Sequence, residues 1–304
     1  MDPFEVHILG CGSALPTTKH FPSSQIVDLH DKLYMIDCGE GAQLQFRKSK
    51  LKFQKIDHIF ISHLHGDHCF GLPGLISTLG LLGRTSDLYI HAPFDAEILF
   101  MPLLEYFCHA LPYKIHFSNV NSEESEVIFE DKTLKVTSIP LNHRVPTAGF
   151  LFEEKPRSPH IIREMIDFYR VPLSQIQAIK DGAPFITGNG ETIPHTVFTR
   201  PADPPRKYAY CSDTAYKKQI VPIIAGVNTL YHEATFCTAD LARARETFHS
   251  SAAQAASIAR AAKVGRLVIG HFSARYPNEQ ILLNEAMKIF PETQLAYERM
   301  IIKI

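Results

Sequence analysis

The stretch ISHLHGDHCFG, residues 61–71, places three histidines and one aspartate between an apolar run and a glycine-rich exit. The residues HIFIS (58–62), which overlap its start, are typical of a strand with large apolar side chains. His63 and His65 are two positions apart, and a strand-like backbone points both side chains to the same side. The pattern therefore brings two imidazoles together at the end of a strand, where α/β proteins commonly carry their chemistry.

The next residues add two more polar groups at the same place. Gly66 permits a sharp turn, and Asp67 and His68 then leave the bend. Imidazole and carboxylate side chains are common ligands of zinc and similar divalent ions. Because the adjacent Asp67 and His68 point away from the first two histidines, one ion cannot bind all four groups. The motif H-x-H-x-D-H therefore predicts two neighbouring metal ions.

Each ion needs further ligands from elsewhere in the chain. Three apolar, strand-like runs end in suitable side chains: SIPLNH in His143, KYAYCSD in Asp213 and RLVIGH in His271. A carboxylate offers two oxygens, so Asp213 is the candidate that bridges both ions.

The composition limits the class of protein. The chain has 304 residues, of which 45% are hydrophobic, and a formal net charge of -1. The length suits one large domain or two modest ones, and the charge argues against a generic nucleic-acid binder with a strongly positive field. No signal-peptide pattern is visible, and no apolar run approaches the roughly 18 residues of a membrane span. Six scattered cysteines without a C-x-x-C pair indicate free thiols and predict a cytoplasmic protein.

Strand-like and helix-like segments alternate along the chain, which predicts an α/β architecture. Strands are expected at 4–9, 24–29, 32–37, 58–62, 89–93, 126–139 and 148–153, and later in KYAYCSD, VNTLYHE and RLVIGH. Helices are expected at 41–49, 71–83, 95–107, 251–263 and 278–288. The segment 154–187 differs, because it carries prolines, mixed charges and two short helix-like pieces. We interpret it as an insertion on the surface of one main domain that spans 1–304.

These segments resemble the metallo-β-lactamase superfamily and, within it, the ribonuclease Z family of tRNA 3′-processing endonucleases. ISHLHGDH is similar to the metal motif of the superfamily. The closer resemblance rests on a series in the family's order: HILGCGSALPT, MIDCGEGAQ, NHRVPTAGF, YCSDT, YHEATF, HSSAAQAASIA and HFSARY. The combination of HEATF, HSSA and HFSARY is the part most specific to ribonuclease Z.

The resemblance implies a four-layer αββα sandwich with an inserted arm and a dinuclear zinc site at the sandwich edge. It assigns the metal ligands to two groups and a bridge: His63, His65 and His143 for one zinc ion; Asp67, His68 and His271 for the other; and Asp213 between them. Two Zn²⁺ ions per chain would activate water for attack on a phosphodiester.

The resemblance also implies catalytic residues. Asp67 would accept the proton of the attacking water in addition to binding metal. His249 lies just before a predicted helix, whose start favours a nearby phosphate, and it is the candidate proton donor to the leaving ribose oxygen, with Glu233 as its partner. Helix capping stays open as an alternative for His249, and a buried salt bridge for Glu233. Asp37 either orients a ligand histidine or forms a turn.

Two segments depart from the family's pattern. In the loop LPTTKHFPSS (15–24), His20 and Phe21 occupy the places of an Arg-Asn pair that helps to sense the tRNA 3′ end. The insertion lacks the Gly-Pro motif of the family's arm. Arg275 is either a phosphate contact or an ordinary surface residue. The ten other histidines are interpreted as structural or surface residues: His7, His20, His30, His58, His91, His109, His116, His160, His195 and His232.

The implied activity is that of a zinc-dependent endoribonuclease that removes the 3′ trailer from precursor tRNA. Ribonuclease Z is usually a homodimer in which the arm clamps the tRNA, and no membrane partner is expected. A small-molecule phosphodiesterase or a lactone or thioester hydrolase on the same dinuclear scaffold remains the alternative, although such enzymes lack the HEATF, HSSA and HFSARY series. The complete ligand set argues against a non-catalytic RNA-binding or metal-storage protein.

Overall fold

The computed structural model describes residues 3–108 and 110–304 of the chain, which divides into two compact units. The larger unit holds the described residues up to Glu130, together with Lys135–Glu153 and Arg206–Ile304. The smaller unit holds Asp131–Leu134 and Glu154–Pro205. None of the helices in the described parts has the length and hydropathy of a membrane-spanning segment.

The first sheet of the larger unit has seven strands in the order β18-β1-β2-β3-β4-β5-β6. Their bounds are β1 (Phe4–Gly10), β2 (Ser24–Leu29), β3 (Lys32–Cys38), β4 (Ile56–Phe60), β5 (Leu88–Ala92), β6 (Ile115–Asn119) and β18 (Ile301–Lys303). The strands from β3 to β6 are parallel, so their carboxyl ends lie at one edge of the sheet.

The second sheet also has seven strands, in the order β17-β16-β15-β14-β9-β8-β7. Their bounds are β7 (Val127–Glu130), β8 (Leu134–Pro140), β9 (Ala148–Glu154), β14 (Lys207–Cys211), β15 (Thr229–Glu233), β16 (Arg266–Gly270) and β17 (Thr293–Leu295). The strands β14 to β17 are parallel, which again collects their carboxyl ends at one edge.

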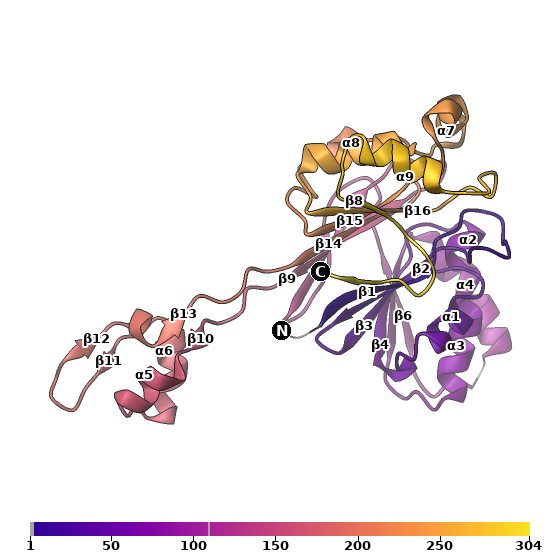
Figure 1. The fold of residues 1–304 in the computed structure, drawn as a ribbon. Coiled ribbons are helices and arrows are strands. Elements are labelled where there is room, and N and C mark those ends of the chain that lie inside the picture. The colour runs from indigo at the N-terminus through magenta and orange to yellow at the C-terminus, as the bar shows by residue number, and fades with distance from the viewer. Residues whose placement is uncertain (1–2, 109) are drawn as a thin grey trace. The chain divides into compact units, whose positions relative to one another are not determined.

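Helices cover the outer face of each sheet (Figure 1). The first sheet is covered by α1 (Ala42–Lys48), α3 (Leu72–Leu81) and α4 (Asp95–Phe107), and the second by α8 (Ala252–Ala262) and α9 (Gln280–Met287). Two shorter helices, α2 (Gly66–Cys69) and α7 (Leu241–Thr247), follow strand ends. Short 3₁₀ helices are η1 (Phe53–Lys55), η2 (Leu173–Gln175), η3 (His195–Val197), η4 (Lys218–Ile220) and η5 (Thr238–Asp240).

The inner faces of the two sheets meet in an aromatic core. The ring of Phe60 on β4 lies 5.5 Å from that of Phe150 and 5.4 Å from that of Phe152, both on β9. On the opposite face of the first sheet, Ile59 and Ile61 belong to a separate buried cluster with residues of the covering helices. This order of helix, sheet, sheet and helix confirms the predicted α/β sandwich.

One predicted strand is broken in the structure. The segment 126–139 was expected to be continuous, but it forms β7 and β8 with a turn between them. The carboxylate of Asp131 accepts the backbone N–H groups of Thr133 and Leu134 over 2.7 and 2.8 Å. This local side-chain bonding competes with the strand ladder and reverses the chain.

The smaller unit has its own buried cluster. Its elements are β10 (His160–Ile161), α5 (Arg163–Phe168), α6 (Ile176–Lys180), β11 (Phe185–Ile186), β12 (Thr192–Ile193) and β13 (Thr199–Arg200). The cluster consists of Ile166, Val171, Ile179, Phe185, Ile193 and Phe198. The unit contains the predicted insertion 154–187 and continues to Pro205. Strands β9 and β14 are neighbours in the second sheet, where Glu153 pairs with Lys207. Most of the smaller unit is therefore inserted in the sequence between these two strands.

Candidate metal centre and catalytic residues

The seven predicted metal-binding side chains all follow strand ends of the larger unit. The fold places them as follows: His63 and His65 after β4, Asp67 and His68 in α2, His143 after β8, Asp213 after β14, and His271 directly after β16. Parallel strands in each sheet bring these ends to one edge, so residues far apart in sequence meet there.

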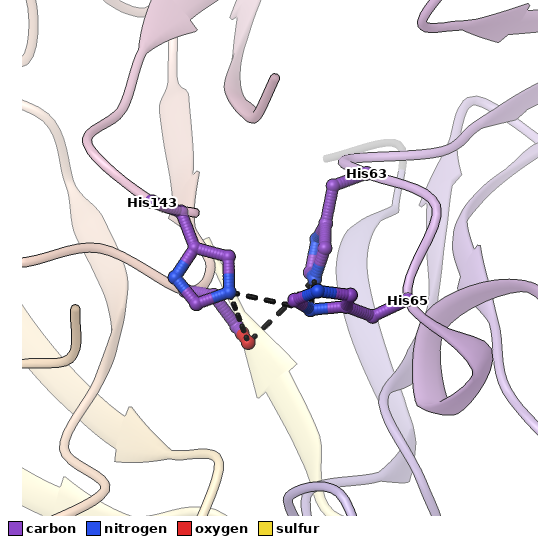
Figure 2. A group of neighbouring side chains, drawn as sticks. His63, His65 and His143 are labelled. Carbon is purple, nitrogen blue, oxygen red and sulfur yellow. Dashed lines mark hydrogen bonds and ion pairs between the residues drawn. The ribbon is translucent and has the colours of Figure 1, made fainter. Parts of the chain in front are cut away.

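The first group consists of His63, His65, His143 and Asp213, whose ligand atoms lie within 4.8 Å of one another. Figure 2 shows the imidazoles of His63 and His65, from one loop, and that of His143, from another, pointing toward one another. His65 Nδ1 lies 3.1 Å from His63 Nε2 and 3.3 Å from His143 Nε2. Asp213 Oδ2 lies 3.6 Å from His63 Nε2 and 3.8 Å from His143 Nε2.

The second group consists of Asp67, His68 and His271. The Nε2 atoms of His68 and His271 are 3.4 Å apart, and Asp67 Oδ2 lies 3.5 Å from each of them. Asp213 Oδ1 lies 3.3 Å from His68 Nε2 and 3.1 Å from His271 Nε2. The two oxygens of Asp213 therefore face different groups, which is the arrangement that a bridging carboxylate requires.

The outer nitrogens of His68 and His143 lie next to hydrogen-bond acceptors. His68 Nδ1 lies 2.8 Å from an oxygen of Asp37, and His143 Nδ1 lies 3.0 Å from the carbonyl oxygen of Phe248. Both partners accept hydrogen bonds, so these Nδ1 atoms carry the protons and the Nε2 lone pairs face inward. Several lone pairs that converge on one small space need a cation between them. The donor set therefore fits divalent metal ions.

The ionisation of the cluster agrees with that chemistry. Burial lowers the pKa of His63 and of His143, which favours the neutral imidazole that binds metals. Burial would also lower the pKa of His68, but the carboxylates of Asp213 and Asp67 outweigh it and raise that pKa. The carboxylates thus favour positive charge at the position where a cation would bind.

Asp37 ties the cluster to both sheets. It is fully buried, and it accepts hydrogen bonds from the backbone N–H of Ser62 and from the hydroxyl of Tyr210, both over 2.7 Å. Its φ of 52° also marks a tight local conformation. The bond to His68 favours the interpretation that Asp37 orients a ligand histidine.

The half-buried His249 and the fully buried Glu233 form a pair beside the first group. His249 Nδ1 lies 2.9 Å from Glu233 Oε1, and the ring of His249 lies 5.1 Å from that of His143. Burial would lower the pKa of His249, but the Glu233 carboxylate outweighs it and raises that pKa to about 9. The other oxygen of Glu233 accepts the hydroxyl of Thr235 over 2.7 Å. The carboxylate is therefore held in place to orient the imidazole.

Helix capping does not account for His249. The side chain of Ser251 caps α8 and accepts the N–H of Gln254 over 3.3 Å, while the Gln254 side chain accepts the N–H of Ser251 over 3.0 Å. This capping box is complete without the histidine.

A pocket of about 280 Å³ opens over the cluster and is lined by His65, Asp67, His143, Asp213, His249 and His271, among others. Three arginines also line it: Arg144, Arg243 and Arg275. Sequence reasoning named only Arg275. The adjacency of Arg144 to His143 was a usable signal, whereas α7, which carries Arg243, was not predicted at all.

The other predicted structural histidines lie away from this pocket where they are described. His232 is buried, and its Nδ1 lies 2.7 Å from the carbonyl oxygen of Glu233. His20 pairs with two glutamates in the loop before β2. His109 lies outside the described residues.

A family profile described as "Anti-Pycsar protein Apyc1" matches residues 4–155, which include the H-x-H-x-D-H motif but end before Asp213. Over all 304 residues, the chain is 60% identical to a ribonuclease Z of Bacteroides fragilis, with 100% of both chains covered. The chain belongs to the ribonuclease Z family.

The match to the ribonuclease Z of Bacteroides fragilis spans the whole chain, including the half after residue 155 that the profile does not match. Human tRNase Z, short form, superimposes with a TM-score of 0.71 at 26% identity, and the match covers 98% of each chain. A metallo-β-lactamase fold protein of Bacillus subtilis shares the fold, with a TM-score of 0.70, 18% identity and 100% of both chains covered. The relatives that match over the full length therefore decide the family, whereas the profile matches only the N-terminal half of the chain.

Proposed function

We propose that the protein is a zinc-dependent endoribonuclease that removes the 3′ trailer from precursor tRNA. The observation that carries the proposal is the His249–Glu233 pair beside seven converging metal-binding side chains, in a chain of the ribonuclease Z family. A hydrolase that needed only metal-activated water would not require a separate, carboxylate-held imidazole at the rim of the pocket.

The donor set fits two zinc ions per chain. His63, His65 and His143 would hold one ion, Asp67, His68 and His271 the other, and Asp213 both. When bound, the ions supply water acidic enough to attack at neutral pH, and positive charge for the phosphate oxygens.

The remaining steps belong to the chain's own side chains. Asp67 accepts a proton from the attacking water while the oxygen of that water forms a bond to phosphorus. The bond from phosphorus to the 3′ oxygen of the upstream nucleotide breaks, and His249 donates a proton to that oxygen. Glu233 orients His249 and stabilises its positive charge through the 2.9 Å hydrogen bond. The products are a tRNA with a 3′ hydroxyl and a trailer with a 5′ phosphate.

The pocket suits a polyanion. Arg144, Arg243 and Arg275 line it together with the cluster, and guanidinium groups bind phosphate through paired N–H donors. A lactone or thioester gains nothing from these guanidinium groups, so this lining favours a phosphodiester substrate over the lactone or thioester alternative.

The proposal also assigns a role to the smaller unit and includes a second copy of the chain. The smaller unit, with its own buried cluster, is the candidate arm that holds tRNA. A second copy of the chain would cover the outward face of α4, where Ile98, Leu99 and Tyr106 are exposed. The enzyme would act in the cytoplasm, in keeping with its free cysteines.

The test uses a precursor tRNA with a 3′ extension and the zinc-loaded protein. We expect cleavage just after the discriminator nucleotide, abolished by a chelator and reduced by about 100-fold or more in Asp67→Ala, because that carboxylate both binds metal and accepts a proton. Glu292→Ala removes an exposed carboxylate just before β17, far in sequence from the candidate site, and is the control that should cleave like the wild type. Intact tRNA together with Asp67-dependent hydrolysis of a small phosphodiester or lactone would overturn the substrate.

A further inference from the structure

The loop between β1 and β2 reaches the candidate metal centre through one backbone amide. Ala14 donates its N–H to Asp67 Oδ2 over 2.7 Å, and this oxygen lies 3.5 Å from Nε2 of His68 and of His271. Ala14 has a φ of 45°, a left-handed conformation that residues with a Cβ rarely adopt. Such a conformation persists only where the surrounding chain holds it.

The far end of this loop is held by His20. Its Nδ1 lies 3.0 Å from Glu298 Oε2, and its Nε2 lies 3.2 Å from Glu279 Oε1. Glu298 also accepts the N–H of Phe21 over 2.9 Å, and the Lys19 ammonium pairs with Glu279. The side chain of His20 is 13% exposed and those of Glu298 and Glu279 are 15% and 10% exposed, so solvent screens these pairs weakly.

Apolar packing contributes little between the two ends. The side chain of Leu15 is 68% exposed. A cavity of about 130 Å³ lies between part of the loop and the 272–279 segment, and its lining includes Thr17, His20 and Phe272. The loop is joined to that segment near its start, where Ser13 donates its N–H to the carbonyl oxygen of Phe272 over 3.1 Å. The loop is therefore held at its start by the Ser13 bond and at its end by the ion pairs of His20. Hydrogen bonds and ion pairs, rather than a packed core, set its conformation.

We propose that His20 is a positioning residue of the reaction. By joining Glu279 and Glu298, it keeps the loop in the conformation in which the Ala14 amide fixes the rotation of the Asp67 carboxylate. This inference rests on the proposed function, because it assigns His20 an effect on the step that Asp67 performs.

A metal ion is not needed to account for this cluster. Cys11 Sγ lies 3.4 Å from His20 Nδ1, and Cys11, His20 and Glu298 form a group that could hold an ion. However, both ring nitrogens of His20 already have carboxylate partners, and a protonated imidazole satisfies both of them. The cluster is complete as an ion-paired network.

Three variants separate positioning from other roles. His20→Gln removes the positive charge, and His20→Arg keeps a charge that can reach two carboxylates. His116→Gln is the matched control, because His116 Nε2 lies 2.8 Å from Asp87 Oδ2 in an ion pair at the start of β5 and β6. For each variant, hydrogen–deuterium exchange of peptides spanning the loop is followed by mass spectrometry. The values of kcat and KM for bis(4-nitrophenyl) phosphate and for precursor tRNA are measured in saturating Zn²⁺.

We expect His20→Gln to exchange the loop amides faster and to lower kcat on the small diester by about 10- to 100-fold, with little change in KM. His20→Arg should recover most of both, and His116→Gln should match the wild type. If the loop amides of His20→Gln exchange at the wild-type rate and its kcat equals that of the wild type, the proposal is wrong.

Two other outcomes would also decide against it. A higher KM for precursor tRNA with an unchanged kcat on the small diester would mean that the loop only contacts RNA. A third bound zinc that Cys11→Ala removes would make His20 a ligand instead. If the wild type cleaves neither substrate, the proposed function itself fails, and the exchange data still decide whether His20 holds the loop.

Discussion

The chemistry of the candidate centre depends on which nitrogen of each histidine faces inward. For His63, His68, His143 and His271, Nε2 faces the cluster, whereas for His65 it is Nδ1. The sequence predicted which side chains would meet, since each follows an apolar strand. It could not predict which nitrogen faces inward, because that depends on partners such as Asp37 and Phe248 O, which only the fold supplies. The role of the five histidines as ligands is a prediction that a measurement of bound metal tests.

The same limit explains why His20 was interpreted as a plain structural residue. Its partners Glu279 and Glu298 lie more than 250 residues away in the sequence, with no local pattern to connect them. By contrast, the pairing of Glu233 with His249 was predicted from family resemblance. The structure places the two side chains in hydrogen-bond contact.

The role of His249 can be tested by its removal. His249→Ala should lower the single-turnover rate on precursor tRNA by about 10² to 10⁴-fold, since the leaving oxygen then lacks its proton donor. Glu233→Gln should have a smaller effect, because an amide still orients the ring but does not stabilise its charge. Metal content, measured by plasma mass spectrometry, should stay at the wild-type value in both variants. Loss of metal from His249→Ala would show that this histidine is a ligand.

At the scale of elements, the sequence predicted the longer helices and strands better than the shortest ones. The helix expected at 95–107 is α4 with the same bounds. The strand expected at 58–62 instead spans Ile56–Phe60, and the Ser62 N–H binds the Asp37 carboxylate rather than a neighbouring strand. The edge strands β6, β17 and β18 were not predicted, and the three residues of β17 and of β18 are too few to show a periodicity.

Helix α4 is apolar on both faces, which bears on assembly. Ala96, Phe100 and Leu104 face the core, while Ile98 and Tyr106 on the other side are 62% and 77% exposed. A surface helix of a monomer normally carries polar groups on its outer face. The outward apolar face therefore supports the proposed contact with a second copy.

That contact predicts the behaviour of a charged variant. Ile98→Glu combined with Leu99→Glu should convert a dimer to a monomer in sedimentation velocity at about 10 μM, because a dimer interface cannot bury unpaired carboxylates without a large free-energy cost. Thermal stability of the monomer should change little, since both side chains are exposed. Val127→Glu replaces another exposed apolar side chain, on β7, and should leave the dimer intact. A wild type that sediments as a monomer would contradict the proposal.

At the scale of the whole molecule, catalysis and substrate holding are assigned to different units. All seven candidate ligands and the His249–Glu233 pair belong to the larger unit, whereas the smaller unit has a separate buried cluster. Its mixed charges gave no sequence signal for RNA, so its role in holding tRNA can be decided only by removal.

The pairing of Glu153 with Lys207 makes a clean deletion possible. Replacing residues 154–206 by Asn-Gly would join β9 to β14 through a two-residue hairpin turn, with the strand register kept. Because the smaller unit's buried cluster leaves as a whole, the deletion should not expose the aromatic core between the two sheets. We expect kcat and KM on bis(4-nitrophenyl) phosphate to stay within about twofold of the wild type, since the metal centre lies in the retained unit.

Precursor tRNA should respond differently. Its KM should rise by about tenfold or more, which corresponds to at least about 1.4 kcal/mol of lost binding free energy. The chemical step at saturating tRNA should be less affected, because positioning at the metal centre is retained. A deletion variant that binds and cleaves precursor tRNA like the wild type would remove the smaller unit from substrate recognition. The arginines of the larger unit would then have to account for the affinity.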